Sequence, residues 1–359
     1  MRPDPAALCA VLAALVVGSV GCAPPDRPSA VAEAAPAAND VDSVLALVAD
    51  RPFNGVALVA RDGRVVGAAT AGWADREAGA PLRRGSRFVI GSVSKQVTAT
   101  LVLREVDAGR LSLDTLLADV LGLDAPWVAG VRVRHLLNHT SGIVEEGEPP
   151  ASAPGTAFAY SNAGYGLLGR VVERTTGEPF AQAASRLFVL CGMDATSVYA
   201  PAEPTGLVPG YDETAAGGFV RASRAGLEDM AAAGGVVSTA DDLVRWTSCL
   251  HGGRVLSPAR YREMVRPSAT RPHRWGPLGY GYGVQVASPG GVLELSHTGQ
   301  IAGFTATVAT YPASGLTLVV LENTSWDDAD PARATAPHDR LRDAVVAAAR
   351  AAPSAAPLP

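Results

Sequence analysis

The sequence predicts an α/β (α+β) fold, in which an antiparallel sheet is flanked by terminal helices and carries an inserted, mainly helical region. The main observation is that strand-like segments occur near both ends of the chain, whereas helix-like segments fill its middle. The composition agrees, because 48% hydrophobic and 18% charged residues suit a globular core rather than long disorder. No internal repeat of fixed period is visible, so a solenoid is not expected.

The first residues are typical of an export signal. Arg2 precedes an apolar stretch, residues 6–20, that is too short to span a bilayer comfortably. Small residues at 19–21 stand directly before Cys22, and this arrangement resembles a bacterial lipobox, in which the cysteine is acylated. We therefore expect a signal peptide over residues 1–21. Two outcomes stay open: an outward-facing membrane lipoprotein anchored through Cys22, or a cleaved protein that is secreted or periplasmic.

The rest of the chain divides by composition. Residues 22–39 are rich in Pro and Ala and are expected to form a tether. Residues 40–352 contain the periodic segments, so we expect the folded domain there. Residues 353–359 are expected to form a disordered tail.

The folded domain opens with a short helix and a hairpin. Residues 40–49 carry apolar side chains at a helical period. Residues 55–60 and 64–73 are typical of two strands, joined by a turn at 61–63 that contains an Asp-Gly pair.

The middle of the chain is mainly helices and loops. Helices are expected over residues 92–108, where Gly109 ends the pattern, and over residues 162–175 and 179–190. A further helix is expected from Thr239, a favourable N-cap, to about residue 250.

Strands return late in the sequence. The expected strands are residues 281–287, 292–296, 304–310 and 316–322, and an Ala-rich amphipathic helix, residues 338–351, completes the domain. The late strands must pair with the early hairpin if one sheet is to bury both sets.

Two cysteines, Cys191 and Cys249, remain in the folded domain. Their spacing does not suggest a metal site, and two cysteines do not make a disulfide framework. Each is expected to be a small buried hydrophobic residue, with pairing left open.

The use of positive charge singles out one residue. The chain contains 29 arginines and a single lysine, Lys95. Arginine cannot lose its proton in a protein, whereas a buried lysine can exchange one. A sequence this biased towards arginine is expected to use lysine only where proton exchange is needed.

Lys95 stands three residues after Ser92, in the segment GSVSK. Positions i and i+3 share one face of a helix, so the amine can reach the hydroxyl and take or orient its proton. Ser92 would lie in the first turn, where free backbone N–H groups and the helix dipole favour negative charge. A solvated lysine on a helix face is the alternative for a bare Ser-x-x-Lys match.

The flanking residues resemble a known family. Residues 88–99 (FVIGSVSKQVTA) resemble the nucleophile segment of the serine β-lactamase and penicillin-binding-protein superfamily, and look closest to its class C β-lactamase, DD-peptidase and esterase branch. Further similar motifs follow in the family's order, and together the motifs span roughly residues 40–325. They are LLNHTSG (136–142), YSN (160–162), GGVVSTADDL (234–243) and HTG (297–299).

This resemblance implies a β-lactamase/DD-peptidase-like fold and roles for particular residues. Ser92 would attack the substrate carbonyl, and Lys95 and Tyr160 would move the protons. A phenol is a poor base unaided, so we expect the Lys95 ammonium to lower the pKa of Tyr160. The sequence leaves open which of the two takes the first proton, since they would titrate as a coupled pair.

Substrate binding is implied for Asn162, His297, Thr298 and Gly299. Asn162 would hydrogen-bond the substrate or the Lys95 amine. The backbone N–H groups of Ser92 and Gln300 would form the oxyanion hole.

His297 departs from the family pattern, which commonly has lysine there. Histidine supplies only a partial, pH-dependent charge near the substrate. If that charge matters, activity should vary with pH near the histidine's titration range. The departure lowers the expectation of an efficient β-lactamase.

The sequence therefore predicts an exported serine hydrolase that forms an acyl-enzyme on Ser92. Its substrate would be a small ester or amide, a β-lactam or a cell-wall peptide, so esterase, DD-peptidase and weak β-lactamase activities stay open. The alternative is an inactive binding protein that retains the penicillin-binding fold. No cofactor is expected, the absence of a basic run makes nucleic acid an unexpected partner, and membrane contact is expected only through the lipid anchor.

Two rival sites carry less weight. His135 and His139 have the i, i+4 spacing of metal ligands, but no third ligand is apparent, so no metal is expected. Ser141 is followed by no lysine and lacks a nucleophile elbow.

Overall fold

An eight-stranded antiparallel sheet forms the centre of the computed structural model, which describes residues 41–46, 51–200, 206–301, 303–327 and 329–352. The predicted signal peptide, Cys22, the tether and the tail lie outside the described residues. The strand order is β10-β11-β12-β13-β14-β15-β1-β2. These strands are β1 (Gly55–Arg61), β2 (Arg64–Ala71), β10 (Ala269–Arg271), β11 (Leu278–Tyr280), β12 (Gln285–Ala287), β13 (Glu294–Ile301), β14 (Phe304–Tyr311) and β15 (Leu316–Glu322).

The sheet joins the two ends of the domain, as the sequence predicts. β1 pairs with β15 along its whole length, from the Gly55–Glu322 pair to the Arg61–Leu316 pair. β1 and β2 form the predicted hairpin, and Asp62 and Gly63 in its turn both have positive φ, as a type I′ turn requires.

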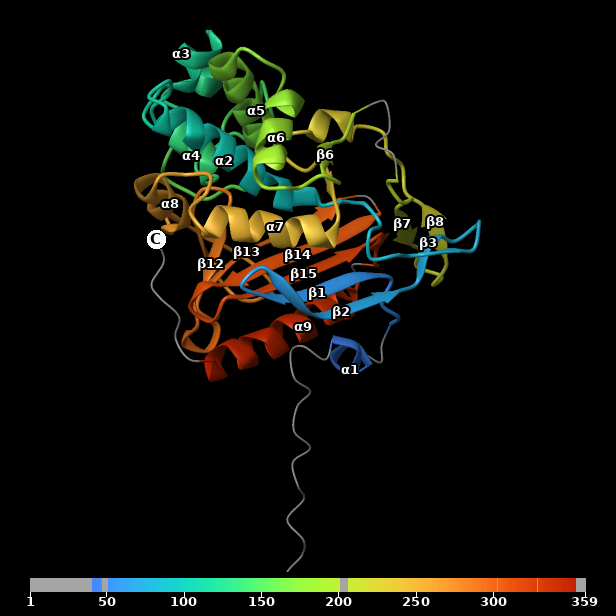
Figure 1. Cartoon of the computed structure of the whole chain (residues 1–359). Coiled ribbons are helices and arrows are strands. Elements are labelled where there is room, and N and C mark those ends of the chain that lie inside the picture. The colour runs from blue at the N-terminus through green and yellow to red at the C-terminus, as the bar shows by residue number, and fades with distance from the viewer. Residues whose placement is uncertain (1–40, 47–50, 201–205, 302, 328, 353–359) are drawn as a thin grey trace, which may run out of the picture. The chain divides into compact units, whose positions relative to one another are not determined.

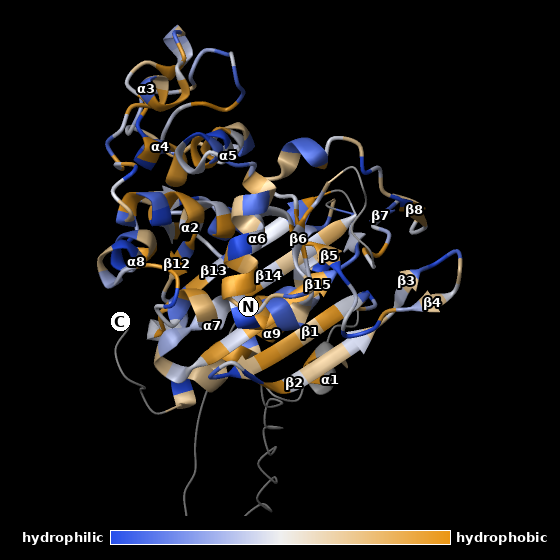
Figure 2. Ribbon diagram, turned by 45° about the horizontal axis from the view of Figure 1, so that its top comes forward, coloured by the Kyte–Doolittle hydropathy of each residue, from blue (hydrophilic) through white to orange (hydrophobic). Residues whose placement is uncertain are grey.

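Helices cover both faces of the sheet (Figure 1). α1 (Val41–Ala46) and α9 (Pro331–Ala351) pack on one face, where Val41, Val44 and Leu341 join a buried cluster with alternate residues of β1 and β15. α7 (Ala240–His251) and the inserted helices pack on the other face. Strands with two buried faces need nearly continuous apolar sequence, and β1 is coloured hydrophobic through most of its length in Figure 2.

The inserted region is helical, as predicted. α2 packs at its centre, its interior residues almost all buried. The helices are α2 (Ser94–Asp107), α3 (Leu117–Leu121), α4 (Val133–Leu137), α5 (Asn162–Thr176), α6 (Phe180–Leu190) and α8 (Pro258–Val265).

Many short elements were not predicted, because two or three residues carry no periodicity. The short strands are β3 (Trp73–Asp75), β4 (Ala80–Pro81), β5 (Phe88–Val89), β6 (Ser197–Val198), β7 (Tyr211–Glu213), β8 (Phe219–Arg221), β9 (Val236–Ser238) and β16 (Thr324–Ser325). The 3₁₀ helices are η1 (Gly91–Val93), η2 (Pro126–Val128), η3 (Glu228–Met230), η4 (Pro289–Gly291) and η5 (Pro312–Ser314).

The single strand predicted over residues 281–287 is wrong. The chain forms β11 and β12 instead, with a turn between Tyr280 and Gln285. Gly283 in this turn has a positive φ of 69°, and a Cβ on Gly281 would lie 2.1 Å from the carbonyl oxygen of Met264 in α8. Glycine is required by this approach and not by strand structure.

The last helix begins earlier than predicted, at Pro331 rather than residue 338. Asp330 caps it, accepting a hydrogen bond from the backbone N–H of Arg333 at 3.0 Å. Pro337 lies inside the helix and cannot donate to the carbonyl of Arg333. The Arg51 side chain donates to that carbonyl instead, Nε to oxygen at 3.0 Å.

Cys191 and Cys249 form a disulfide, which answers the question of pairing that the sequence left open. Cys191 caps the C-terminus of α6 and Cys249 lies in α7, so the bond joins two helices that sequence spacing alone does not bring together. Both residues are buried.

Among the described residues, no helix combines the length and the apolar character that a transmembrane span needs.

Candidate active site

Ser92 lies in η1, directly before α2 and beside β13. This close approach depends on Gly299, where a Cβ would lie 2.1 Å from the Ile90 carbonyl oxygen and 3.1 Å from the Ser92 nitrogen. On the facing segment, a Cβ on Gly91 would lie 3.0 Å from the Gln300 nitrogen. The Ser92 and Gln300 backbone nitrogens, which are predicted to form the oxyanion hole, therefore both lie where η1 and β13 approach each other closely.

Lys95 is fully buried, at 0% exposure, and its amine contacts three oxygen atoms. Nζ lies 3.1 Å from Ser92 Oγ, 2.8 Å from Asn162 Oδ1 and 2.6 Å from the Ala233 carbonyl oxygen. The helix brings Ser92 and Lys95 together, as the i, i+3 spacing predicts. Asn162 arrives from the first turn of α5; the residue is exposed, but its amide oxygen accepts from the buried amine.

Burial lowers the pKa of Lys95 well below its usual range, and the positive charge of Arg271 lowers it further. None of the three atoms in contact with the amine carries a negative charge. The neutral amine is therefore the form that this site favours.

His139 holds the segment that contains Tyr160. The His139 carbonyl accepts from the Ala159 N–H at 2.8 Å, and its Nδ1 accepts from the Ser161 N–H at 3.1 Å. Its ring stacks on the Tyr160 ring with centroids 4.2 Å apart. Burial, followed by the charge of Lys95, lowers the pKa of His139 well below its usual range, so Nδ1 stays available as an acceptor. The HTSG turn thereby positions Tyr160.

Tyr160 lies beside the amine, with Lys95 Nζ 4.8 Å from its ring centroid. Its hydroxyl is buried and has no hydrogen-bond partner among the residues that the structure describes. Burial raises the pKa of Tyr160, although interactions with the Ser92 hydroxyl and the Arg271 charge oppose the rise. The Ser92 interaction falls short of a hydrogen bond of good geometry.

The expected effect of Lys95 on Tyr160 is therefore wrong. The sequence led us to expect that a Lys95 ammonium would lower the pKa of the phenol. Desolvation dominates instead, and it acts on both groups, because it disfavours the ammonium as well as the phenolate.

His297 does not supply a partial charge to the site, contrary to expectation. It is completely buried, with Nε2 2.9 Å from the Tyr280 hydroxyl and Nδ1 2.7 Å from the Thr298 carbonyl oxygen. Burial lowers its pKa well below the usual range, and the charges of Arg271 and Lys95 add to this effect. His297 is thus a neutral, structural side chain at ordinary pH.

Thr298, by contrast, is only partly buried. Its Oγ1 lies 3.3 Å from His273 Nε2 and 3.4 Å from Gln285 Nε2. Gln300, two residues later, is exposed.

Sequence reasoning missed three contributors to the site. The Ala233 carbonyl has no side-chain signal. His273 carried no motif, and Arg271 was one arginine among 29. Arg271 ends β10, and its guanidinium carbon lies 4.7 Å from the Tyr160 ring centroid. We call Ser92, Lys95, Tyr160, Asn162 and Arg271 the Lys95 cluster.

The rival sites have structural explanations. His135 Nδ1 accepts from the Arg132 N–H at 3.2 Å, whereas His139 faces Tyr160, so the two histidines do not converge. Within the described part of the chain, no group of three or more His, Cys, Asp or Glu side chains could hold a metal ion. Ser141 Oγ accepts from the Ile143 N–H at 3.2 Å, inside the turn.

Comparison with known proteins gives a consistent result. The protein-family model described as Beta-lactamase matches residues 42–342. Penicillin-binding protein 4 of Amycolatopsis lactamdurans is 31% identical over 288 residues, which cover 69% of this chain and 75% of that protein. The esterase EstB of Burkholderia gladioli is 34% identical over 195 residues, covering 43% of this chain and only 50% of the esterase.

The fold is also found among solved structures. The D-amino acid amidase of Ochrobactrum anthropi SV3, complexed with L-phenylalanine amide, superposes with a TM-score of 0.73 at 25% identity. The match covers 86% of this chain and 98% of the amidase.

Proposed function

The chain belongs to the beta-lactamase family of serine hydrolases, and on that premise we propose that it is an exported enzyme that cleaves an ester or amide bond through an acyl-enzyme on Ser92. Its relatives are named as an esterase, a penicillin-binding protein and D-aminopeptidases, so the bond class is supported more firmly than any one substrate.

The set of contacts around the Lys95 amine carries the proposal. A neutral amine has two N–H groups and one lone pair. The Asn162 amide oxygen and the Ala233 carbonyl can only accept, so they take the two N–H groups. The remaining neighbour is the Ser92 hydroxyl, which can donate its proton to the lone pair. Lys95 is accordingly the base that activates Ser92, and this assigns the first proton transfer that the sequence left open.

Acylation then begins with a tetrahedral intermediate. The Ser92 proton moves to Lys95 as Oγ forms a bond to the substrate carbonyl carbon, and the electron pair of the carbonyl double bond moves to its oxygen. The negative charge that develops on the carbonyl oxygen is stabilised by the N–H groups of Ser92 and Gln300.

Tyr160 serves the breakdown of this intermediate. Its ring lies beside the amine, and its hydroxyl has no hydrogen-bond partner among the described residues. The hydroxyl can therefore donate a proton to the departing oxygen or nitrogen, as the bond from that atom to the carbonyl carbon breaks, and recover one from the Lys95 ammonium. A water molecule then attacks the acyl carbon, and Lys95 takes a proton from it. As the bond between that carbon and Ser92 Oγ breaks, Lys95 returns the proton to Oγ and the acid product is released.

Covalent labelling tests the proposal. The protein is incubated with a fluorophosphonate or a β-lactam, and its intact mass and peptide map are measured. We expect one adduct on Ser92, none on Ser92→Ala, and an unchanged adduct on Ser112→Ala, which alters an exposed serine. Folded protein that reacts with neither reagent would support the non-catalytic binding protein.

Substrate profiling narrows the reaction. Hydrolysis of a small neutral ester, a D-Ala-D-Ala peptide and a chromogenic cephalosporin is compared under one set of conditions. Esterase, DD-peptidase and weak β-lactamase activities predict different orders of kcat/KM.

Export is supported by the disulfide as well as by the signal-like sequence. Disulfides persist mainly in oxidising compartments. We expect cell fractionation to place the protein in the membrane or outside the cytoplasm, with Cys191 and Cys249 closed to thiol reagents, and Cys22→Ser to remove any lipid mass. A cytoplasmic protein with two reactive thiols would contradict export.

A further inference from the structure

The link between η3 and β9, residues 231–235, supplies the Ala233 carbonyl that accepts from the Lys95 amine. This link is a turn rather than a helix or a strand. Three of its backbone N–H groups, those of residues 233–235, converge on the Met230 carbonyl oxygen at 2.9, 2.7 and 2.8 Å. A carbonyl oxygen has only two lone pairs, so the three bonds compete for it. The turn therefore depends on contacts from outside to hold its shape.

Two hydroxyl groups of α2 provide such contacts. Thr98 Oγ1 donates to the Ala232 carbonyl oxygen at 2.6 Å, and Ser94 Oγ accepts from the Val236 N–H at 3.1 Å. Both side chains are completely buried. One hydroxyl thus binds the residue directly before Ala233, and the other binds the first residue of β9.

The two hydroxyls lie on the same side of α2 as the amine. Residues three and four positions apart share a helix face, which places Thr98 beside both Lys95 and Ser94. The amine therefore meets the link between two points at which α2 already holds it. Two successive carbonyls are accepted in this way, that of Ala232 by a hydroxyl and that of Ala233 by the amine.

We infer that Thr98 and Ser94 are positioning residues for the proton transfer. By fixing the Ala233 carbonyl, they keep the lone pair of the Lys95 amine directed at Ser92. An amine turns about its last carbon–nitrogen bond, so the direction of its lone pair is set by the acceptors of its N–H groups. The inference rests on the proposed function, in which this lone pair takes the serine proton.

The same helix offers a matched control. Thr100 is also completely buried, and its hydroxyl donates to the Gln96 carbonyl oxygen at 2.8 Å, inside α2 itself. Removing either threonine hydroxyl costs the fold a buried hydrogen bond. Only the Thr98 hydroxyl leads to the carbonyl that orients the amine, so a merely structural role predicts similar effects of Thr98→Val and Thr100→Val on activity.

Steady-state kinetics provide the first test. Thr98→Val replaces the hydroxyl with a methyl group of similar size. We expect kcat for a small neutral ester to fall about 10- to 100-fold with KM nearly unchanged, because a misplaced base slows the chemical step without weakening binding. Thr98→Ser, which keeps the hydroxyl, should restore most of the rate. Thr100→Val should leave kcat close to the wild-type value.

Combined variants provide the second test, with the rate of Ser92 labelling by a saturating fluorophosphonate as the measurement. Ser94→Ala should slow labelling as Thr98→Val does. The double variant should lose less than the product of the two single losses, because both hydroxyls act through one carbonyl. In the Lys95→Met protein, which has no amine to orient, adding Thr98→Val should not slow labelling further.

Three results would overturn the inference. They are equal values of kcat in Thr98→Val and Thr100→Val, independent losses in the double variant, and a further loss on adding Thr98→Val to Lys95→Met. Circular dichroism confirms that each variant is folded. If Thr98→Val does not fold, Ser94→Ala gives the same comparison with Thr100→Val, because it frees the other end of the link.

Failure of this inference differs from failure of the proposed function. Wild-type protein that forms no adduct on Ser92 and cleaves no ester would remove the proposed function itself. An adduct that forms equally fast with and without the Thr98 hydroxyl would keep the proposed function and remove only the positioning role.

Discussion

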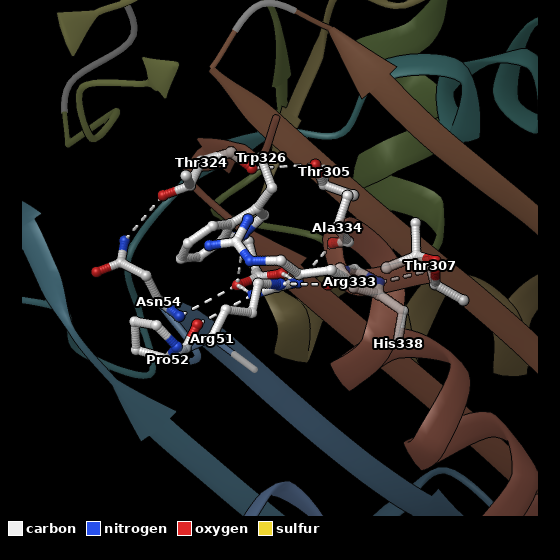
Figure 3. A network of polar contacts seen from close by, with 12 residues as sticks. Arg51, Pro52, Asn54, Thr305, Thr307, Thr324, Trp326, Arg333, Ala334 and His338 are labelled. Carbon is white, nitrogen blue, oxygen red and sulfur yellow. Dashed lines mark hydrogen bonds and ion pairs between the residues drawn. The ribbon is translucent and has the colours of Figure 1, made fainter. Parts of the chain in front are cut away.

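Two groups of polar residues, each around a buried basic side chain, use opposite arrangements of charge. The first is the Arg51 network, which we define as Arg51, Glu322, His338, Asn54 and Trp326. Figure 3 labels Arg51, Asn54, Trp326 and His338 among them. The second is the Lys95 cluster. Each contains a buried basic side chain, Arg51 or Lys95, yet only the first contains a carboxylate, that of Glu322.

In the Arg51 network every donor of the guanidinium is used. Nη1 and Nη2 donate to the two carboxylate oxygens of Glu322 at 2.9 and 2.7 Å. The remaining N–H groups donate to backbone carbonyls, including the one that Pro337 leaves free on Arg333. His338 Nε2 lies 3.1 Å from the same carboxylate. The network therefore ties β15 to α9 and to the segment before β1.

In the Lys95 cluster, by contrast, some polar atoms have no hydrogen-bond partner within the described residues. The Tyr160 hydroxyl and Arg271 Nη1 are buried without partners in the described part of the chain. Burial lowers the pKa of Lys95, whereas the charges of Arg51 and His338 help to hold the pKa of Glu322 at about 2, against the desolvation that would raise it.

The comparison separates residues that stabilise the fold from residues that can react. A buried charge with a complete set of partners keeps its charge and joins elements together. A buried amine without a counter-ion loses its charge and becomes a base. Five predictions test this contrast.

The largest effect is expected at Lys95. Lys95→Arg places a permanent positive charge there and removes the lone pair that accepts the Ser92 proton, so acylation of Ser92 should slow by about 10²- to 10⁴-fold. The rate of adduct formation, measured by mass spectrometry after rapid quenching, checks this value. Near wild-type acylation in Lys95→Arg would refute the assigned base.

Two further variants separate chemistry from packing. Arg104→Lys makes the reciprocal exchange on the same helix, at a residue that bonds the Val255 carbonyl, and should leave acylation unchanged. Lys95→Met removes the amine with little change of volume, and should be as inactive as Lys95→Arg while still folding, as judged by circular dichroism.

Breaking the Arg51 network should affect stability instead of chemistry. Glu322→Gln leaves the Arg51 charge buried and unpaired, so the free energy of unfolding should fall by about 3–5 kcal/mol. Urea titration measures this loss. Asp241→Asn, which breaks an exposed pair with Arg84, should lower it by less than about 1 kcal/mol. A loss of acylation in folded Glu322→Gln protein would show that the two regions are not separate.

The pH dependence of stability should report the same network. The Glu322 pKa is lowered, so its contribution is complete above the ordinary value of 4.5 and is lost as pH falls through about 2. At about 1.4 kcal/mol per unit, the loss amounts to about 3 kcal/mol. Urea titrations from pH 5 to 2 should show this slope in the wild type and not in Glu322→Gln; equal slopes would contradict it.

The smallest effect is expected at His297. Because this histidine is neutral, His297→Gln should lower the free energy of unfolding by only about 1 kcal/mol, through its lost bond with Tyr280. The profile of kcat/KM against pH should keep its shape. If the wild-type profile of kcat/KM showed a transition near pH 6.5 that disappeared in His297→Gln, the charge of His297 would matter for activity after all.

The acid limb of that profile belongs to Lys95. Activity requires its neutral form, so kcat/KM should rise with pH through the lowered pKa of Lys95 and then level off. Arg271→Gln removes a repelling charge, and the limb should therefore move to higher pH for carboxylate and neutral substrates alike.

Periodicity and turn residues in the sequence were enough to predict the local features of this protein. The hairpin, α2, α5, α6 and the late strands β14 and β15 follow from periodicity and turn residues, which act over short spans. The pairing of Ser92 with Lys95 follows from one turn of helix, and the single lysine marked the residue because arginine cannot replace its chemistry.

Contacts and pKa shifts that depend on burial or on distant segments could not be predicted before the tertiary structure was known. Desolvation neutralises His297 and raises the pKa of Tyr160, and no local pattern measures desolvation. The Cys191–Cys249 bond, the Ala233 carbonyl and Arg271 each reach their partners from far along the chain. A sequence pattern records which groups are present, whereas the pKa and the partner of each group are set by what folds against it.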